Sequence, residues 1–318
     1  MRILTYILGI SLIIGLSSCQ EDIVAIYGCT NSAADNYNPE ATIDNGICTG
    51  VIACTDSTAS NYDSDASINC GCKYQNVRRV LVEEFTGHKC GNCPRAAETL
   101  HDIACSKGNQ IIGLAVHVGF FAKPAAEPFQ DDYRSTAGDA LDSQFGNSVA
   151  GLPNGLVNRK EYNGSPISSN TDWETKVDEI LLEPADAKLT ISNIYNADSR
   201  NLNTKVSAEI LGALDAANYS LAIYLVEDSI ISAQTDYAAD PTTIEDYVHM
   251  HMLRTSLNGV WGENISSSAL TAGQLFETTG SITVDDEYKD QHLYIVSILS
   301  NDDTKEVVQV NKSSYIND

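Results

Sequence analysis

Basic residues are scarce in this chain of 318 residues. Lysine and arginine together number 19 against 43 aspartates and glutamates, and the formal net charge is −24 at pH 7. A nucleic-acid-binding protein needs a basic patch to neutralise phosphates, so the composition excludes a nucleic-acid partner. The acidic surface instead suits solubility, divalent cations or basic partners.

A long hydrophobic run is missing too. The apolar segment after Arg2 covers residues 3–16 and is shorter than the roughly 20 residues of a membrane-spanning helix. Its length and positive start are typical of a secretory signal peptide, here residues 1–18. The segment ends in Leu16-Ser17-Ser18-Cys19, which resembles the lipobox of bacterial lipoproteins; an ordinary signal peptide with an unrelated cysteine is the alternative.

The lipobox resemblance implies that Cys19 is lipidated after cleavage and that residues 19–24 form a tether. Gln20 rather than aspartate follows Cys19, which in lipoproteins implies sorting to the outer membrane. The acyl chains would hold this acidic protein at the membrane. The sequence leaves open whether the protein faces the periplasm or the cell surface.

Cysteine, by contrast, is abundant: the nine cysteines indicate an oxidising compartment. Residues 25–74 hold two copies of one pattern, Cys-Thr, then Ala-x-Asn-Tyr, then Ala-(Thr/Ser)-Ile-(Asp/Asn). Units this short need staples, and Cys29–Cys48 is the expected disulfide of the first copy. The copies resemble small modules that decorate secreted bacterial proteins.

Oxygen-bearing side chains in both repeats suggest one cofactor, calcium. The candidate ligands are Asn36, Asn38 and Asp44 in the first copy and Asn61, Asp63 and Asp65 in the second. Their spacing is not that of an EF-hand loop. The alternative is that these side chains satisfy backbone groups in solvated turns.

The stretch Val80–Pro94 organises the rest of the chain. A β-branched strand is followed by a polar turn and then by Cys90-Gly91-Asn92-Cys93. The next apolar residues, at helical spacing, predict an amphipathic helix; they are Ala96, Ala97, Leu100, Ile103 and Ala104. Cys90 is expected at the helix N-terminus, where the helix dipole together with His88 and Lys89 would favour a thiolate.

The two cysteines would then have different roles. Cys90 would attack, Cys93 would resolve the mixed disulfide, and Glu84, six residues before Cys90, would exchange a proton with Cys93. This arrangement resembles the thioredoxin superfamily over residues 76–185. The resemblance implies a cis-proline loop facing the cysteines, for which Leu152-Pro153 is the candidate, so Pro153 would align the substrate. The Gly-Asn dipeptide between the cysteines departs from the best-known redox dipeptides.

Two other interpretations of the cysteine pair remain. A Cys-x-x-Cys is sometimes half of a zinc site, with His88, His101 and Cys105 nearby in sequence. On a continuous helix, however, Cys105 would lie roughly 18 Å from Cys93, too far to share one ion. The pair would otherwise be a redox-inert structural disulfide on a thioredoxin-like scaffold.

The cysteine count constrains the remaining bridges. Cys54, Cys70, Cys72 and Cys105 are left after the assignments above. One of Cys70 and Cys72 would close on Cys54 and the other on Cys105, near the end of the predicted helix; sequence does not fix which.

Further elements fit an α/β domain. A buried strand is predicted over residues 111–118, a helix over 129–145, a strand over 155–158, and a helix with a capping box at Thr171 that ends before Pro184.

From residue 186 the pattern changes to alternating and apolar strands, which predicts a β-sandwich over residues 186–318. Inside it, a long connection over residues 238–262 carries His249 and His251. Packing and ligand or metal binding are both open for these histidines.

The whole layout resembles the Gram-negative outer-membrane lipoproteins named for an outer membrane protein of twenty-eight kilodaltons. The lipobox, residues 84–95, residues 152–159 and His249-x-His251-x-x-Arg254 carry the likeness. The family implies location and fold more than activity. Two functions therefore stay open: a thiol–disulfide oxidoreductase acting on envelope or extracellular proteins, and a non-catalytic surface binding or adhesion protein.

Overall fold

The computed structural model describes residues 27–28, 34, 36–41, 43–44, 50–64 and 66–317. The chain divides into two compact units, residues 1–51 and 52–318. In the first unit, β1 (Tyr27–Gly28) pairs in parallel with β2 (Ile43–Asp44). Within the described residues, no helix combines the length and apolar character needed to cross a membrane.

The second cysteine-rich repeat belongs to the larger unit. It contains β3 (Ile52–Ala53) and β4 (Ile68–Asn69), which pair in parallel. Of the pairings that the sequence left open, the structure has Cys54–Cys72 and Cys70–Cys105. The second bridge ties the repeat to the C-terminal part of the first long helix, the end away from Cys93.

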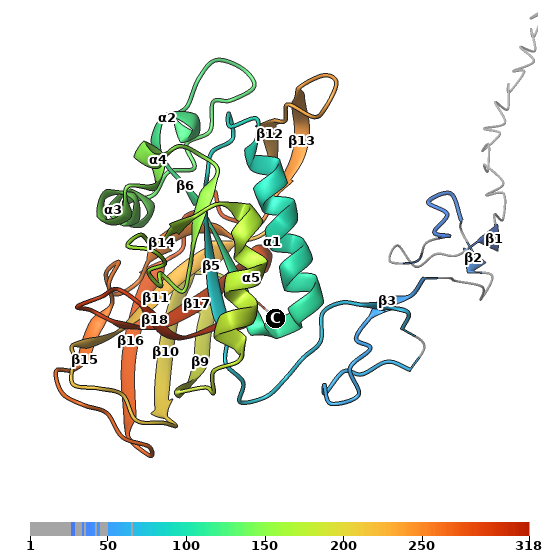
Figure 1. Cartoon of the computed structure of the whole chain (residues 1–318). Coiled ribbons are helices and arrows are strands. Elements are labelled where there is room, and N and C mark those ends of the chain that lie inside the picture. The colour runs from blue at the N-terminus through green and yellow to red at the C-terminus, as the bar shows by residue number, and fades with distance from the viewer. Residues whose placement is uncertain are drawn as a thin grey trace, which may run out of the picture. The chain divides into compact units, whose positions relative to one another are not determined.

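An α/β section follows the repeat (Figure 1). Its strands run in the order β6 (Ile111–His117), β5 (Val80–Thr86), β7 (Asn154–Val157) and β8 (Ile167–Ser168). β5 and β6 are parallel, whereas β7 is antiparallel to both β5 and β8. All seven residues of β5 are buried, so the strand that leads into the cysteine motif lies in the core.

Two helices lie side by side over one face of this section, α1 (Cys93–Lys107) and α5 (Asn170–Leu181). Ala96, Leu100 and Ile103 of α1 face Trp173 and other apolar residues of α5 in one cluster. The predicted capping box is displaced by two residues, because the hydroxyl of Ser169 rather than Thr171 accepts the cap bond, from the backbone N–H of Thr171.

Three short helices cover the other face: α2 (Gly119–Ala122), α3 (Thr136–Phe145) and α4 (Asn147–Ala150). Two 3-10 turns lie in other parts of the chain, η1 (Gly108–Gln110) and η2 (Asp290–His292). The helix expected over residues 129–145 begins only at Thr136, where the Ser135 hydroxyl accepts from the N–H of Gly138. Residues 129–135 are irregular because this cap fixes the start of the helix.

The C-terminal part is a β-sandwich. One sheet contains β9 (Ala187–Asn196), β10 (Asn201–Ile210) and β16 (Leu275–Thr283). The facing strands are β11 (Tyr219–Glu227), β17 (Leu293–Asn301) and β18 (Val307–Tyr315), with β15 (Glu263–Ser266) paired to β11. One apolar cluster fills the space between the two layers, and the predicted sandwich is confirmed.

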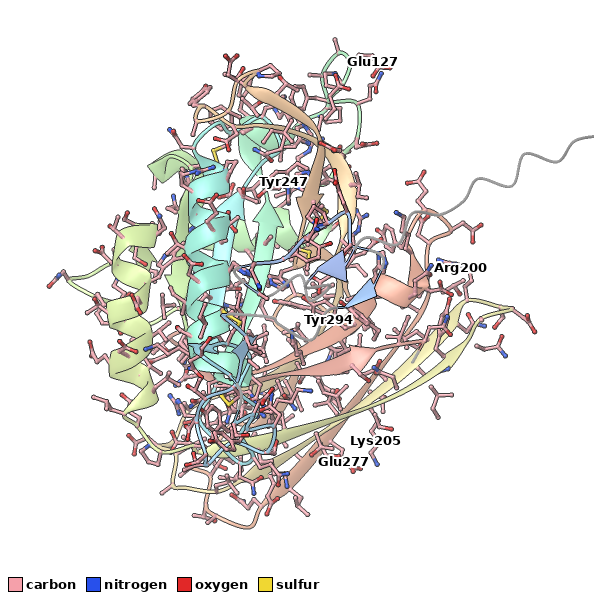
Figure 2. The ribbon with its side chains drawn as sticks, turned by 90° about the vertical axis from the view of Figure 1, so that its right-hand side faces the viewer. Glu127, Arg200, Lys205, Tyr247, Glu277 and Tyr294 are labelled. Carbon is pink, nitrogen blue, oxygen red and sulfur yellow. A yellow bond between two sulfur atoms is a disulfide. The ribbon has the colours of Figure 1, made fainter. Side chains whose placement is uncertain are left out.

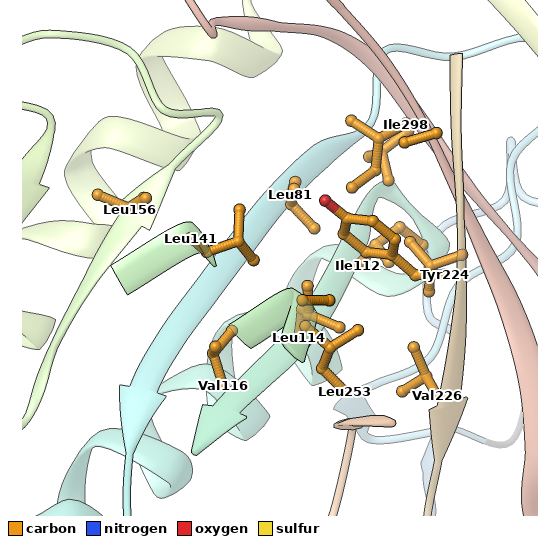
Figure 3. Close-up of a cluster of buried hydrophobic side chains, with 14 of the residues drawn as sticks. Leu81, Ile112, Leu114, Val116, Leu141, Leu156, Tyr224, Val226, Leu253 and Ile298 are labelled. Atoms are coloured by element: carbon orange, nitrogen blue, oxygen red, sulfur yellow. The ribbon is translucent and has the colours of Figure 1, made fainter. Parts of the chain in front are cut away.

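The two parts share one sheet rather than meeting as separate domains. β14 (Met252–Ser256) pairs with β11 and, through Met252 opposite Ala115, with β6. Figure 3 shows that Leu81 and Ile112 of the α/β section share a core with Tyr224 and Ile298 of the sandwich. Residues 52–318 therefore form one compact unit.

The stretch expected as a long connection, residues 238–262, includes two strands. It contains β14 and also β13 (Thr243–His249), which pairs with β12 (Ile230–Thr235). These two strands form a hairpin that joins neither large sheet. Figure 1 places this hairpin beside the start of α1, which is where the cysteine motif lies.

Candidate redox site

Cys90 and Cys93 form a disulfide at the start of α1. Pro94 occupies the first turn, the first turn contains no acidic residue, and Asn92 makes no capping bond with its side chain. The partial positive charge of the helix N-terminus is therefore not offset locally, which favours a thiolate when the pair is reduced. Both cysteines are nevertheless buried, at 3% and 2% exposure.

Only one of the two predicted cationic neighbours contributes charge. Lys89 lies over the Phe120 ring, with its Nζ 5.1 Å from the ring centroid. His88 is buried and stacks on Phe129 at 5.5 Å. Burial, and secondly the charge of Lys89, lower the pKa of His88, so its imidazole is neutral at pH 7. The expectation that His88 adds positive potential is wrong for this reason.

Glu84 is buried, at 3% exposure. Burial raises its pKa to about 8, although a hydrogen bond with the Thr86 side chain opposes the rise. Glu84 and Cys93 both line a small cavity of about 30 Å³, together with His117 and His249. A space of this size has room for about one water molecule. A neutral carboxyl group is thus held where it can give a proton to Cys93 at neutral pH.

A second space gives Glu84 access to solvent. It is an open groove of about 550 Å³ along α1, whose walls include His101, Asp102 and Met250. Glu84 and Tyr247 line both the groove and the small cavity, and Figure 2 shows where Tyr247 lies. Protons can therefore reach Glu84 from the groove side, even though the cysteine side is covered.

Pro153 lies at the same end of the sheet as the cysteine motif. The Leu152–Pro153 peptide bond is cis, as are Glu127–Pro128 and Asp240–Pro241. Asn154 follows Pro153 and is opposite Phe85, near the end of β5. β5 leads within four residues to Cys90, so both chain segments reach the same edge.

A feature without a sequence signal covers the motif. Backbone N–H groups of Thr235 and Tyr237 donate to the carbonyls of His88 and Gly91, at 2.8 and 2.9 Å. The side-chain amide of Gln234 donates to the carbonyl of Cys90 at 3.1 Å. The segment Gln234–Tyr237, which we name the cover, follows the motif by more than 140 residues and has no distinctive composition.

His249 and His251 have different surroundings. His249 is buried among aromatic rings, 4.9 Å from Tyr247, and burial lowers its pKa to about 4. His251 places Nδ1 3.0 Å from a carboxylate oxygen of Asp228 and 3.0 Å from the Tyr294 hydroxyl. Both therefore pack between elements, and among the described residues no group of three or more histidine, cysteine, aspartate and glutamate side chains is arranged to hold a metal.

Some of the predicted site residues lie outside the residues that the structure describes. They are Cys19, Cys29, Cys48 and Asp65, together with the side chain of Asp44. Of the other calcium candidates, Asn38 accepts from the N–H of Glu40, and Asn61 accepts from Lys73 and donates to the carbonyl of Gly71. The Asn38 contact is that of a local turn, whereas Asn61 bonds to residues at the other end of its repeat. Calcium binding by the repeats stays a prediction.

Comparison with known proteins places the chain in a family. The model of the family described as outer membrane protein Omp28 matches residues 138–317, which is more than half of the chain. No curated protein matches.

Two solved structures are similar. HBP35 of Porphyromonas gingivalis is 16% identical over 76% of each chain, with a TM-score of 0.59, which shows a shared fold. A domain of the outer membrane lipoprotein Omp28 from Porphyromonas gingivalis is 17% identical over 41% of this chain and 88% of that chain, with a TM-score of 0.28. The second score says nothing about the fold. The family match is what identifies the chain: it belongs to the Omp28 family of outer membrane proteins, and its location is the outer membrane.

Proposed function

We propose that Cys90 and Cys93 are the redox-active pair of a thiol–disulfide oxidoreductase held at the outer membrane. The observation that carries the proposal is a disulfide at an uncapped helix N-terminus with a neutral, buried Glu84 lining the same cavity as Cys93. Its substrates would be cysteine-containing proteins of the envelope or the cell exterior. Lipidation of Cys19 would supply the membrane attachment.

A thioredoxin-like domain over residues 76–185 is part of the proposal. The strand order β6-β5-β7-β8, with β5 and β6 parallel and the others antiparallel, supports it. So does the position of Pro153, directly before Asn154 at the edge of the sheet that bears the cysteines. In this domain Pro153 would align a substrate strand beside Cys90.

The proposed exchange begins from the disulfide. A substrate thiolate attacks Sγ of Cys90, the Cys90–Cys93 bond breaks, and Cys93 leaves as a thiolate that takes the proton of Glu84. A second substrate thiolate then attacks the substrate sulfur of the mixed disulfide and releases Cys90 as a thiolate stabilised by the helix N-terminus. Two electrons pass from the substrate, whose two thiols become a disulfide, to the cysteine pair.

Trapping the mixed disulfide tests this proposal. Reduced Cys93→Ser protein, with Cys90 free and no resolving thiol, is expected to take up one glutathione from glutathione disulfide at Cys90, because the bond cannot be resolved. Peptide mass mapping locates the adduct. Cys90→Ser is the matched control and should take up glutathione at least about tenfold more slowly, because Cys93 lines the small inner cavity of about 30 Å³, which is too small to admit glutathione disulfide. Equal rates in the two variants would contradict the assignment of Cys90 as the attacking thiol.

One observation favours the second function, a non-catalytic surface binding protein. The cover leaves Cys90 only 3% exposed, as expected for a structural disulfide. In that case the α/β section would be a scaffold, and the repeats and exposed loops would contact the partner.

A further inference from the structure

The cover is held by a separate element of the fold. β12 and β13 pair only with each other, and the cover includes the last two residues of β12 and the start of the connection to β13. The hairpin can therefore move without breaking a ladder of either large sheet. Local openings of such elements cost less free energy than global unfolding.

The contacts of the cover are those of a bound polypeptide strand. Thr235 and Tyr237, two residues apart, donate their backbone N–H groups to the carbonyls of His88 and Gly91 on the two sides of Cys90. Gln234 donates to the carbonyl of Cys90 itself. Bonds between backbones do not depend on side-chain identity, so another extended chain could make them in place of Thr235 and Tyr237.

A side-chain contact explains the glycine between the cysteines. A Cβ added at Gly91 would lie 2.5 Å from two ring carbons of Tyr237, so the ring rests directly on the Gly91 backbone. Gly91 is not among the glycines with positive φ, and alanine would therefore be strained only by this ring. The cover also contacts α1 through a side chain. Asp236 forms an ion pair of 2.6 Å with Arg95 in the first turn of that helix.

We propose that the surface beneath the cover is the binding site for an extended, cysteine-bearing polypeptide, and that Gln234–Tyr237 is its displaceable internal occupant. The proposal rests on the redox function proposed above. A substrate segment would replace the cover, donate its own backbone N–H groups to the same two carbonyls and bring its own sulfur to Cys90. The cover would slow the reaction of the disulfide with small thiols until such a segment arrives.

The exchange needs no reactant besides the substrate. With the cover displaced, a substrate thiolate attacks Cys90, Cys93 departs with a proton, and the second substrate thiolate completes the substrate disulfide. The cysteine pair gains the two electrons that the substrate loses.

Opening the cover by mutation is the test. The mature full chain is mixed with dithiothreitol or with a synthetic extended peptide carrying two cysteines. Samples are quenched with N-ethylmaleimide, and labelling of Cys90 and Cys93 is followed by peptide mass mapping. The variants are Tyr237→Ala and Gly91→Ala, which remove the ring contact from either side. Leu275→Ala is the matched control, because Leu275 is 70% exposed on β16 and Tyr237 is 66% exposed.

In Tyr237→Ala and Gly91→Ala, the Cys90–Cys93 disulfide is expected to be reduced at least about tenfold faster than in wild type with either reagent. The reason is that a larger fraction of the molecules has the cover displaced. The gain should be larger for the peptide, which needs the whole strand site, and Leu275→Ala should match wild type. Equal rates in all four proteins, with measurable exchange in wild type, would overturn the cover proposal and leave the redox function standing. No reduction of the pair in any of them would overturn both.

Discussion

Glu84→Gln is expected to stabilise the protein at neutral and alkaline pH. Burial raises the pKa of Glu84 from 4.5 to about 8, so between these values the unfolded chain is ionised while the folded protein holds the proton. Stability contributed by this group is present below pH 4.5 and is lost as pH rises towards 8. At about 1.4 kcal/mol per pKa unit, the loss approaches roughly 5 kcal/mol. Glutamine does not ionise, so the Glu84→Gln variant does not lose this stability as the pH rises.

Urea unfolding of wild type and Glu84→Gln between pH 4 and 9 checks this expectation. The two free energies of unfolding should coincide near pH 4 and diverge with rising pH, with the variant the more stable. Glu174→Gln, an exposed position on α5, should follow wild type throughout. Parallel curves for wild type and Glu84→Gln would show that Glu84 is ionised in the folded protein. An acid at this position therefore costs stability, and the proton transfer to Cys93 proposed above would be the compensation.

Arg159→Met is expected to destabilise the protein by about 3–5 kcal/mol, because it leaves a buried carboxylate unpaired. Arg159 and Glu83 are 2% and 0% exposed and form two bonds, Nε to Oε2 at 2.8 Å and Nη2 to Oε1 at 2.6 Å. The guanidinium also lies 5.5 Å from the ring of Trp261. Arg159 thus joins β5 of the α/β section to a loop of the sandwich.

An exposed ion pair provides the control. Lys205 and Glu277 lie 2.8 Å apart at about half exposure on the neighbouring strands β10 and β16. Figure 2 labels both residues. Lys205→Met should cost under about 1 kcal/mol. Adding Glu83→Leu to Arg159→Met should recover much of the loss, since both buried charges are then gone. Equal costs for Arg159→Met and Lys205→Met in urea unfolding would show that the buried pair contributes little.

Local patterns predicted much of the α/β section. The apolar run from Val80 and the helical spacing after Cys93 correspond to β5 and α1, because each pattern reports which face of its own element is buried. The placement of Glu84 follows from the same register, since six residues span the end of a strand and a turn. Alternating residues likewise predicted the sandwich strands.

The remaining features depend on contacts between distant segments. The pairing of Met252 with Ala115, which merges the two parts into one sheet, has no local pattern. The cover is a similar case: Gln234 reaches Cys90 across 144 residues, and its bonds are to backbone carbonyls that every sequence has. The neutral state of His88 could not be predicted from the sequence either. It depends mainly on burial against Phe129, which joins residues distant in the chain.

The reduction potential of the Cys90–Cys93 pair tests the central claim most directly. The purified protein is equilibrated with dithiothreitol buffers of graded potential, trapped with N-ethylmaleimide and mapped by mass spectrometry, with Cys54–Cys72 as the internal structural reference. Structural disulfides have potentials below about −300 mV. The redox-active account predicts a potential above about −300 mV for Cys90–Cys93 and a lower one for Cys54–Cys72. A Cys90–Cys93 potential at or below that of the reference bridge would contradict it.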